Sequence, residues 1–414
     1  MHDRRILISG AGIAGPALAH ALAGQGHDIT VVERAPALRD GGQAVDFRGP
    51  VHRAVLERLD LWRPICERRT PGIDLVLLRR DGTPAATLPS VMMSGDVEIV
   101  RGDLSRLLHE RTAASVAYRF GDHITALEPL ADGVRVCFAR GGDETFGLVV
   151  GADGLHSGVR RLAFGPESRF LEHHGYRLAT YSLPNLLGIK GQALTYTVPG
   201  RAIAVSSDGG DQARAMLIHA APALGPTRAD PDAVRTALLA AYRDVGWHAP
   251  RVLAELPRAT DLYVDEIATV TIDRYATGRI VLLGDAAWGG TLGGQGTSLA
   301  IVGAYVLAGE LAAARGDVAA ALARYETRMR PYATSCQTGA RRVGSFFAPR
   351  TRLGIAVRNL MYRALTSRLL VRQFEKLVKA SATGFELPVY AASARAGDRP
   401  VDRADTGACS SSSW

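Results

Sequence analysis

The chain has 414 residues, of which 47% are hydrophobic and 22% charged, a composition typical of globular proteins and not of disordered or fibrous chains. The formal net charge is +8, and the stretch from Ala340 to Lys379 alone holds ten basic residues and one acid. No basic stripe with interleaved aromatics and no nucleic-acid-binding motif accompanies this charge, which argues against a nucleic-acid partner.

Cysteine and apolar patterns argue against a metal, a redox disulfide or a membrane span. Cys66, Cys137, Cys336 and Cys409 lie far apart, without the CxxC or Cys/His spacing of a metal site or a redox pair. No apolar run reaches the ~18 residues that a membrane-spanning helix needs. We therefore expect a soluble cytoplasmic protein, a monomer or homodimer, with reduced thiols and no bound metal.

The first 33 residues predict a β-α-β unit. An apolar strand at residues 5–9 leads through a glycine-rich turn into a helix at 14–25, and a second strand follows at 28–33. Farther along the chain, helices are expected at 105–112, 231–245, 297–315 and 318–329, and strands at 133–139, 146–150 and 279–283. Short strand-like runs bounded by Gly, Pro and Asp predict a sheet between 176 and 270, which a strand pair at 72–88 would extend.

The glycine-rich turn carries the pattern GxGxxG. Gly10 permits a tight turn, Gly12 lets the backbone approach a pyrophosphate, and Gly15 lets the helix pack on the strand. The start of the helix offers unpaired N–H groups to phosphate oxygens. Glu33 ends the second strand, where a carboxylate accepts hydrogen bonds from ribose hydroxyls. This pattern predicts an adenine dinucleotide site, and the acid favours FAD or NAD over an NADP phosphate at this position.

Two further motifs each place an aspartate after a buried strand. GADGLHSGVR spans residues 151–160, and LLGDAAW spans 282–288 before a second glycine run at 293–297. Asp153 or Asp285 taken singly could be a helix cap. Both together, in a chain that also has the first motif, favour contacts with the sugar or ribityl chain of a nucleotide.

With these three motifs in order, the chain resembles the single-component, class A flavoprotein monooxygenases of the para-hydroxybenzoate hydroxylase fold, over about residues 3–390. Within that family it is similar to tetracycline-inactivating enzymes and to polyketide-tailoring hydroxylases of antibiotic biosynthesis. The resemblance implies an α/β fold: a discontinuous Rossmann-like FAD-binding domain (1–71, 89–175 and 271–330), an inserted β-sheet substrate domain (72–88 and 176–270) and C-terminal helices (331–390). Polar residues 391–414 predict a disordered tail.

The resemblance also implies a set of cofactor-binding residues. Those expected at FAD are Gly10, Gly12, Ala14, Gly15, Glu33, Arg34, Asp46, Arg101, Gly284, Asp285, Gly294, Gln295 and Gly296. Asp153, Gly154 and Arg160 are expected to serve both FAD and NADPH, and Arg39 to touch NADPH. Three residues depart from the family pattern: Trp288 replaces a histidine, Leu292 a proline and Ser298 an asparagine. The proline position lies beside the flavin on the substrate side in relatives, so Leu292 bears on the shape of the substrate site and on the placement of the flavin there.

The chemistry that the resemblance implies needs few protein side chains. NADPH or NADH reduces FAD, O2 adds at flavin C4a, and the distal oxygen of the hydroperoxide passes to an electron-rich carbon of an aromatic or polyketide-like molecule. His173, His174 and His219 could deprotonate a phenol, but each is equally typical of a packed or surface histidine. No catalytic residue is therefore assigned.

Other functions on this fold remain open. Epoxidation and Baeyer–Villiger insertion use the same machinery, a prenyl-chain reductase would work without oxygen, and a ligand-sequestering flavoprotein would not turn over. The WxWxIP signature of flavin-dependent halogenases is absent, and so is the cysteine pair of a disulfide reductase.

The basic C-terminal stretch has apolar residues at helical spacing: Leu353, Val357, Leu360, Met361, Ala364 and Leu365. We expect a helix that docks across the two domains with its arginines in solvent, in preference to a helix on a membrane surface.

Overall fold

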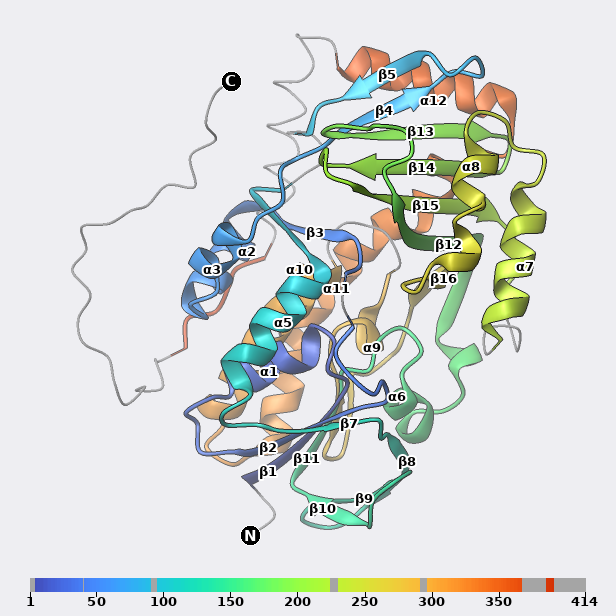
Figure 1. Cartoon of the computed structure of the whole chain (residues 1–414). Coiled ribbons are helices and arrows are strands. Elements are labelled where there is room, and N and C mark those ends of the chain that lie inside the picture. The colour runs from blue at the N-terminus through green and yellow to red at the C-terminus, as the bar shows by residue number, and fades with distance from the viewer. Residues whose placement is uncertain are drawn as a thin grey trace, which may run out of the picture.

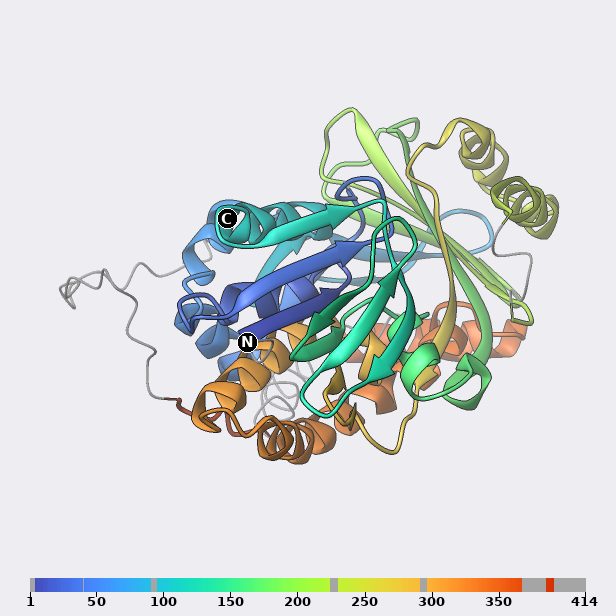
Figure 2. The same cartoon turned by 90° about the horizontal axis from the view of Figure 1, so that it is seen from below.

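The computed structural model describes residues 4–39, 41–90, 95–223, 230–290, 296–366 and 385–390. Over these residues the protein has a mixed α/β fold with two large sheets, a six-stranded one in the lower half of Figure 1 and a seven-stranded one in the upper half. Figure 2 shows the same arrangement from below. A three-stranded and a two-stranded sheet complete the strands of this part of the chain.

The six-stranded sheet is parallel except at one edge. In spatial order its strands are β17 (Ala276–Thr277), β18 (Ile280–Leu282), β11 (Leu148–Gly151), β1 (Arg5–Ser9), β2 (Asp28–Glu33) and β7 (Ala117–Phe120), with β17 antiparallel. Residues along β1, β11 and β18 are almost all buried, as in parallel sheets covered on both faces. The predicted N-terminal β-α-β unit is confirmed.

The main helices of this half are α1 (Ala14–Ala21), α5 (Arg101–Thr112), α10 (Gly296–Ala313) and α11 (Val318–Phe347). Helix α1 is shorter than predicted because the chain turns through Gly24 and Gly26, both with φ of 78°. Helix α11 is longer than predicted and continues through Pro331, where packing of the fully buried Met329 and Ala333 holds it. Among the described residues, α10 alone is long and apolar enough to cross a membrane, but 67% of it is buried between its neighbours, as in a core helix.

The predicted strand at 146–150 is wrong in one respect, because the chain changes sheets at Gly147. Phe146 ends β10 (Glu144–Phe146), which pairs with β9 (Val134–Phe138) and, through it, β8 (Ile124–Pro129) in the three-stranded sheet. Leu148 begins β11 in the six-stranded sheet, and the Gly147 N–H between them donates to the Arg5 carbonyl at 2.9 Å.

The seven-stranded sheet joins segments that are far apart in the chain. Its order is β16 (Tyr263–Val270), β12 (Leu171–Pro184), β15 (Gln212–Ala220), β14 (Arg201–Ser207), β13 (Gln192–Val198), β4 (Asp74–Leu78) and β5 (Pro84–Leu88). Only the β13–β4 pair is parallel. Helices α7 (Pro231–Tyr242) and α8 (Ala249–Leu253) cover one face through a core that includes Tyr181, Leu217 and Leu238.

Shorter elements link and flank these layers. They are the strands β3 (Ala44–Phe47) and β6 (Val97–Val100), which pair antiparallel, the helices α2 (Gly49–Arg58), α3 (Trp62–Glu67), α6 (Gly158–Ala163), α9 (Asp285–Trp288) and α12 (Arg352–Leu365), and the 3-10 turns η2 (Glu167–Arg169) and η4 (Leu256–Arg258).

Helix α12 corrects the expectation for the basic C-terminal stretch. It packs on β5 and β13, yet its apolar residues Leu353, Val357, Leu360 and Met361 are exposed. Ala364 is exposed too, whereas the side chain of Leu365 and the predicted tail at 391–414 lie outside the described residues. The arginine predicted in solvent at position 358 is instead buried, because it donates hydrogen bonds to three groups of the protein interior.

Candidate functional site

A cavity of about 420 Å³ lies where the carboxyl ends of β1, β2 and β11 approach β16. This edge of a parallel sheet is the usual position of a bound nucleotide. Most of the predicted cofactor residues line the cavity: Gly10, Gly12, Ala14, Glu33, Arg34, Arg39, Arg101, Asp153, Gly154, Asp285 and Gly296. Gly15, Asp46, Arg160 and Gly284 do not line it, and Gly294 and Gln295 lie outside the described residues.

The three glycines of the first motif have different surroundings. Gly10 has φ of 109°, and a Cβ there would lie 2.4 Å from the Ala152 carbonyl oxygen. A Cβ at Gly15 would lie 2.0 Å from the Gly10 oxygen, so that position serves the packing of α1 on β1. A Cβ at Gly12 would meet only the Arg101 guanidinium, at 3.6 Å, and otherwise faces the cavity. Helix α1 begins without a side-chain cap, which leaves its first N–H groups for a ligand.

Glu33 holds the turn and reaches the cavity at the same time. Its Oε2 accepts from the Ala11 N–H and its Oε1 from the Ala35 N–H, both at 2.8 Å. Each carboxylate oxygen has a further lone pair, so these bonds orient the carboxylate and still allow it to accept from a hydroxyl.

Asp153 ties together the loop that follows β11. Its carboxylate accepts from the Ser157 hydroxyl, from the Val159 N–H at 3.1 Å and from the Ser9 hydroxyl at 3.3 Å. Ser157 in turn caps α6 by accepting from the Arg160 N–H at 2.9 Å. Burial raises the pKa of Asp153, and these hydrogen bonds oppose the rise. Asp153 therefore stabilises this loop through hydrogen bonds and also lines the cavity.

Arg160 is fully buried beneath the cavity and does not line it. Its guanidinium donates to the Ala286 carbonyl at 2.9 Å and to the Leu155 carbonyl at 2.6 Å, and lies 3.5 Å from the Glu167 carboxylate. The structure thus gives Arg160 a role in joining the loop after β11 to helix α9. Any effect on a cofactor would pass through those loops.

Asp285, at the start of α9, is exposed only into the cavity. This enclosed position raises the pKa of its carboxyl, an effect that nearby Arg101 opposes. Gly284, with φ of 65°, makes the sharp turn before it, and a Cβ there would lie 2.9 Å from the Ala14 Cβ. Gly296 starts α10 opposite Asp285, since its Cβ position lies 3.4 Å from the Asp285 Oδ1.

Asp46 lies on β3, outside the cavity wall. Its carboxylate is 3.4 Å from the Arg48 guanidinium, and burial raises its pKa against the opposing charge of Arg48. Gly41 and Gly42, which precede β3 in the chain, have φ of 67° and 93°, and a Cβ at Gly42 would contact Arg101 at 3.4 Å.

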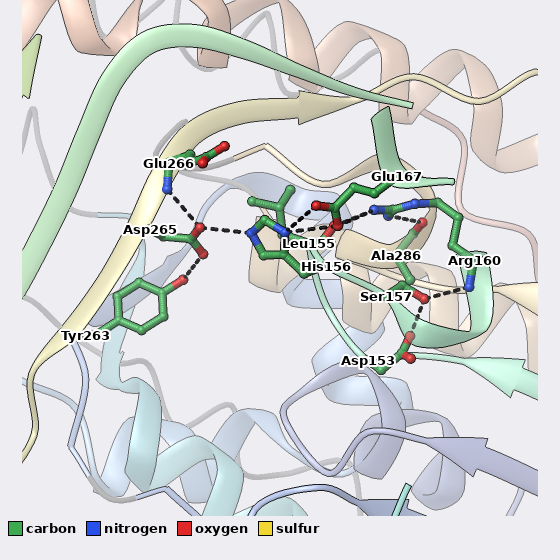
Figure 3. A network of polar contacts seen from close by, with 10 residues as sticks. All are labelled: Asp153, Leu155, His156, Ser157, Arg160, Glu167, Tyr263, Asp265, Glu266 and Ala286. Atoms are coloured by element: carbon green, nitrogen blue, oxygen red, sulfur yellow. Dashed lines mark hydrogen bonds and ion pairs between the residues drawn. The ribbon is translucent and has the colours of Figure 1, made fainter. Parts of the chain in front are cut away.

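A polar network that the sequence did not single out contributes His156, Tyr263 and Asp265 to the lining of the same cavity (Figure 3). His156 bridges two carboxylates, with Nδ1 3.0 Å from both Glu167 oxygens and Nε2 3.1 Å from Asp265 Oδ1. The Tyr263 hydroxyl donates to Asp265 Oδ2 at 2.5 Å. Tyr263 is 40% exposed, but toward the cavity, and burial together with the Asp265 carboxylate raises its pKa well above the usual range. The only sequence signal was the position of His156 inside the second motif.

The three histidines considered from sequence do not line this cavity. His173 Nδ1 accepts from the Gly175 N–H at 3.1 Å, and His174 Nε2 lies 3.0 Å from the Thr269 hydroxyl. His219 is buried on β15 against Tyr242, and burial lowers its pKa to about 4. None of them is placed to act on a ligand in the cavity.

The departures from the family motif fall partly outside the cavity. Trp288 is buried in the core, with its ring centroid 5.2 Å from that of Tyr275 and 6.2 Å from that of Tyr325. Ser298 is buried in α10, and Leu292 lies outside the described residues. Trp288, the last residue of α9, therefore fills core space against Tyr275 and Tyr325 and does not line the cavity.

A second cavity of about 380 Å³ opens at the ends of β12 and β15. The Arg214 guanidinium donates to the Ser182 hydroxyl at 3.2 Å and lies 3.5 Å from the Asp261 carboxylate, which accepts from the same hydroxyl at 2.6 Å. A Cβ at Gly41 would lie 3.4 Å from Arg214, whereas one at Gly42 would touch Arg101 of the first cavity. Gly41 thus lines the second cavity, and its neighbour Gly42 lies against Arg101, which lines the first.

Comparison with known proteins agrees with this geometry. The model of the FAD binding domain family matches residues 3–340. An uncharacterized Mycobacterium tuberculosis protein is 39% identical over 78% of this chain and 88% of its own length, and a flavin-dependent monooxygenase of Legionella longbeachae is 34% identical over 80% and 87%. The crystal structure of the tetracycline destructase Tet(51) superposes with a TM-score of 0.81 at 28% identity, covering 94% of this chain and all of that one.

An FAD site requires three features that this structure has. They are a cavity at the carboxyl edge of a parallel sheet, a glycine turn shaped for a dinucleotide, and an aspartate after each of two further strands. The family match covers all three features. The chain belongs to the FAD binding domain family and is an FAD-dependent monooxygenase of the para-hydroxybenzoate hydroxylase fold.

Proposed function

We propose that FAD lies along the first cavity with its pyrophosphate at the Gly10–Gly15 turn. The residues fit: the Cβ position of Gly12 faces the cavity, α1 begins uncapped, and Glu33 is oriented at the strand end. Arg34, Arg101, Asp153 and Asp285 would hold the remainder of the cofactor. Segments 1–71, 89–175 and 271–330 would then form the discontinuous FAD domain, with 72–88 and 176–270 as the substrate domain.

We further propose that NADPH or NADH and O2 are the co-substrates, and that the product is a hydroxylated aromatic or polyketide-like molecule. A bound flavin, once reduced, supplies the activation of O2. The observation that favours a polycyclic substrate is the likeness to a tetracycline destructase over 94% of the chain. Arg39, Gly154 and the loop that Arg160 supports are the positions proposed to meet the nicotinamide cofactor, in a cytoplasmic enzyme.

The second cavity is the proposed substrate site. Arg214 and Gln212 present N–H donors there, suited to keto or enolate oxygens, while Ser182 and Asp261 hold the guanidinium in place. Gly41 lines this cavity and Gly42 lies against Arg101 of the first, so a flat ring held here would approach the flavin from this side. The protein would thereby orient the reacting carbon and exclude bulk water, with no nucleophilic side chain.

The test is NADPH consumption by the purified protein with FAD, in air, against a panel of polycyclic phenols. We expect a yellow protein, oxidation stimulated by one substrate class, and a product heavier by one oxygen atom. Arg214→Met should raise the KM for that substrate and leave FAD binding unchanged, whereas Gly12→Val should abolish FAD binding. A yellow protein without oxygen-dependent turnover would favour a reductase or a sequestering protein, and a colourless protein that FAD cannot reconstitute would exclude the proposal.

A further inference from the structure

Helix α12 is oriented with its apolar side outward. Leu353, Val357, Leu360 and Met361 are 73%, 56%, 65% and 46% exposed. Their spacing of four, three and one residues places them on one stripe of the helix. Large exposed residues scattered singly are ordinary, but four on one helix face form an apolar patch that calls for a partner.

The opposite side of α12 is fixed by polar contacts, so this orientation is built into the fold. Arg358 is 5% exposed and donates to the carbonyls of Phe346 and Phe347, at 3.3 and 2.8 Å, and to the Thr197 hydroxyl at 3.2 Å. Tyr362, one turn later, packs edge-on against Phe346 with ring centroids 5.2 Å apart. Rotating the helix to bury its leucines would expose these contacts and leave two carbonyls unsatisfied.

The segment that carries the stripe has charges of one sign. Residues 341–366 contain six arginines and neither aspartate nor glutamate; of these, Arg341 pairs with Glu172 at 2.9 Å and Arg358 is buried. Arg352 and Arg363 are exposed and eleven residues apart, close to three helical turns, so they lie on the same side of α12 next to the stripe. Exposed Arg342 adds to this charge at the end of α11.

We propose that α12 is an interfacial helix that inserts Leu353, Val357, Leu360 and Met361 into the surface of an anionic lipid bilayer, with Arg352 and Arg363 at the headgroups. Such a bilayer surface binds an apolar stripe by burying it at the boundary of the acyl chains, and it attracts the neighbouring arginines to its anionic headgroups. A second copy of the chain would suit the apolar stripe but would bring two arginine-rich helices together, so charge complementarity favours the lipid.

The position of α12 leaves the active site free for such contact. The helix packs on β5 at one edge of the seven-stranded sheet, whereas Tyr263 and Asp265 of the FAD cavity lie on β16 at the other edge (Figure 1). Membrane contact through α12 would therefore not cover the first cavity.

The test is co-sedimentation of the full-length, FAD-loaded protein with phosphatidylcholine vesicles that do or do not contain phosphatidylglycerol, at low and high salt. We expect binding only to the anionic vesicles, weakened by salt. The double variants Leu353→Glu/Leu360→Glu and Arg352→Gln/Arg363→Gln should each lose on the order of tenfold or more in affinity. Leu186→Glu, which changes an exposed leucine elsewhere (36% exposed), is the matched control and should bind as the parent does.

Three outcomes would overturn the proposal. One is equal binding to neutral vesicles, or none to anionic ones. Another is a dimer in sedimentation velocity that Leu353→Glu/Leu360→Glu dissociates, because the stripe would then be a protein interface. The third is a clearly lowered Tm of that variant, which would show that the chain covers the stripe itself. Unchanged NADPH oxidation in all variants separates these results from any failure of the proposed enzymatic function.

Discussion

His219 and His52 are histidines that burial keeps neutral. His219 is 6% exposed, with its ring edge-on to Tyr242, and burial, assisted by Arg177 and Arg201, lowers its pKa to about 4. His52 is 2% exposed between the Arg48 N–H and the Tyr332 hydroxyl, and burial lowers its pKa to about 4 as well. Among the residues that the structure describes, no carboxylate is hydrogen-bonded to either ring, and near His52 the Asp96 charge opposes the effect of burial.

We predict that these histidines make the protein less stable in acid. The folded-state pKa of His219 is about 4 and the unfolded value is 6.5. Between pH 6.5 and pH 4 the unfolded chain therefore binds a proton at this histidine, whereas the folded protein does not. Stability is therefore lost as pH falls through this window, with a slope of about 1.4 kcal/mol per pH unit for each such histidine.

Urea unfolding from pH 7 to pH 4.5 checks this prediction. His219→Phe, which keeps the ring shape, should remove one histidine's share of the slope. His219→Gln packs differently but also cannot titrate, and should show the same smaller slope. A parent-like slope in both variants would contradict the assignment.

At the residue scale, the sequence identified the positions that backbone geometry dictates and missed those that tertiary structure assembles. Gly10 and Gly15 could be predicted because a turn and a close approach leave room for glycine alone, and Gly12 because its Cβ position faces the cavity. Tyr263 and Asp265 could not, because only the pairing of β16 with β12 brings that strand to the cavity beside His156. His173, His174 and His219 were considered as bases because of their residue type alone, and residue type does not determine where a side chain points.

Among the elements, helices α10 and α11 are joined by one buried carboxylate. Glu310 is 2% exposed and accepts from Arg324 at 2.5 Å, from Arg328 at 2.7 Å and from the Tyr390 hydroxyl at 2.8 Å. Burial raises the pKa of this carboxyl, but the hydrogen bonds from its three partners outweigh burial and lower it. The charged form is therefore the one that holds α10, α11 and the segment 385–390 together.

We predict that Glu310→Gln lowers the free energy of unfolding by about 2 kcal/mol, because two charge-assisted hydrogen bonds from Arg324 and Arg328 are lost. The loss stays moderate because both arginines are half-exposed and regain water. Denaturant unfolding at pH 7 measures the loss. The same substitution at exposed Glu57, which pairs with Arg53 at 2.8 Å on α2, is the control and should leave stability almost unchanged. Equal losses at the two positions would contradict a role specific to Glu310.

Periodicity predicted the elements well where one side of each faces a core. The apolar runs of β1, β2 and β18 and the helices α7 and α10 were all anticipated, since burial alone determines their pattern. The pattern of α12 was read in the same way and its apolar stripe was expected to be buried. Its orientation is set instead by Arg358, whose hydrogen bonds to the end of α11 require the opposite face to pack.

At the scale of the whole molecule, two sheets with separate cores meet at the first cavity. Helix α11 crosses between them, contacting α10 in one half and β12, β15 and β16 in the other. On the cavity wall itself, His156 of the loop after β11 meets Asp265 of β16 at 3.1 Å (Figure 3). No local pattern reports such a junction, which is why the sequence outlined each sheet but not the residues that connect them.

This junction leads to a prediction about coupling between FAD and the stability of the whole protein. Asp265 is 3% exposed and accepts from His156, from Tyr263 and from the Glu266 N–H. In Asp265→Asn one oxygen is replaced by a donor, so the Tyr263 hydroxyl or the imidazole loses its acceptor and the wall beside the cofactor shifts. We expect FAD to bind roughly tenfold more weakly to this variant, a change of about 1.4 kcal/mol.

Unfolding with and without FAD measures this coupling directly. At a hundredfold excess over the Kd of the parent protein, FAD should add about 2.7 kcal/mol to the free energy of unfolding of the parent and about half that to Asp265→Asn. Asp261→Asn makes the same change on the second cavity, where the carboxylate accepts from Ser182, and should keep the full gain. If Asp265→Asn also keeps the full gain, the network holds the two sheets together without contributing to cofactor binding. A loss confined to Asp265→Asn would show that the β16 wall contributes to FAD affinity.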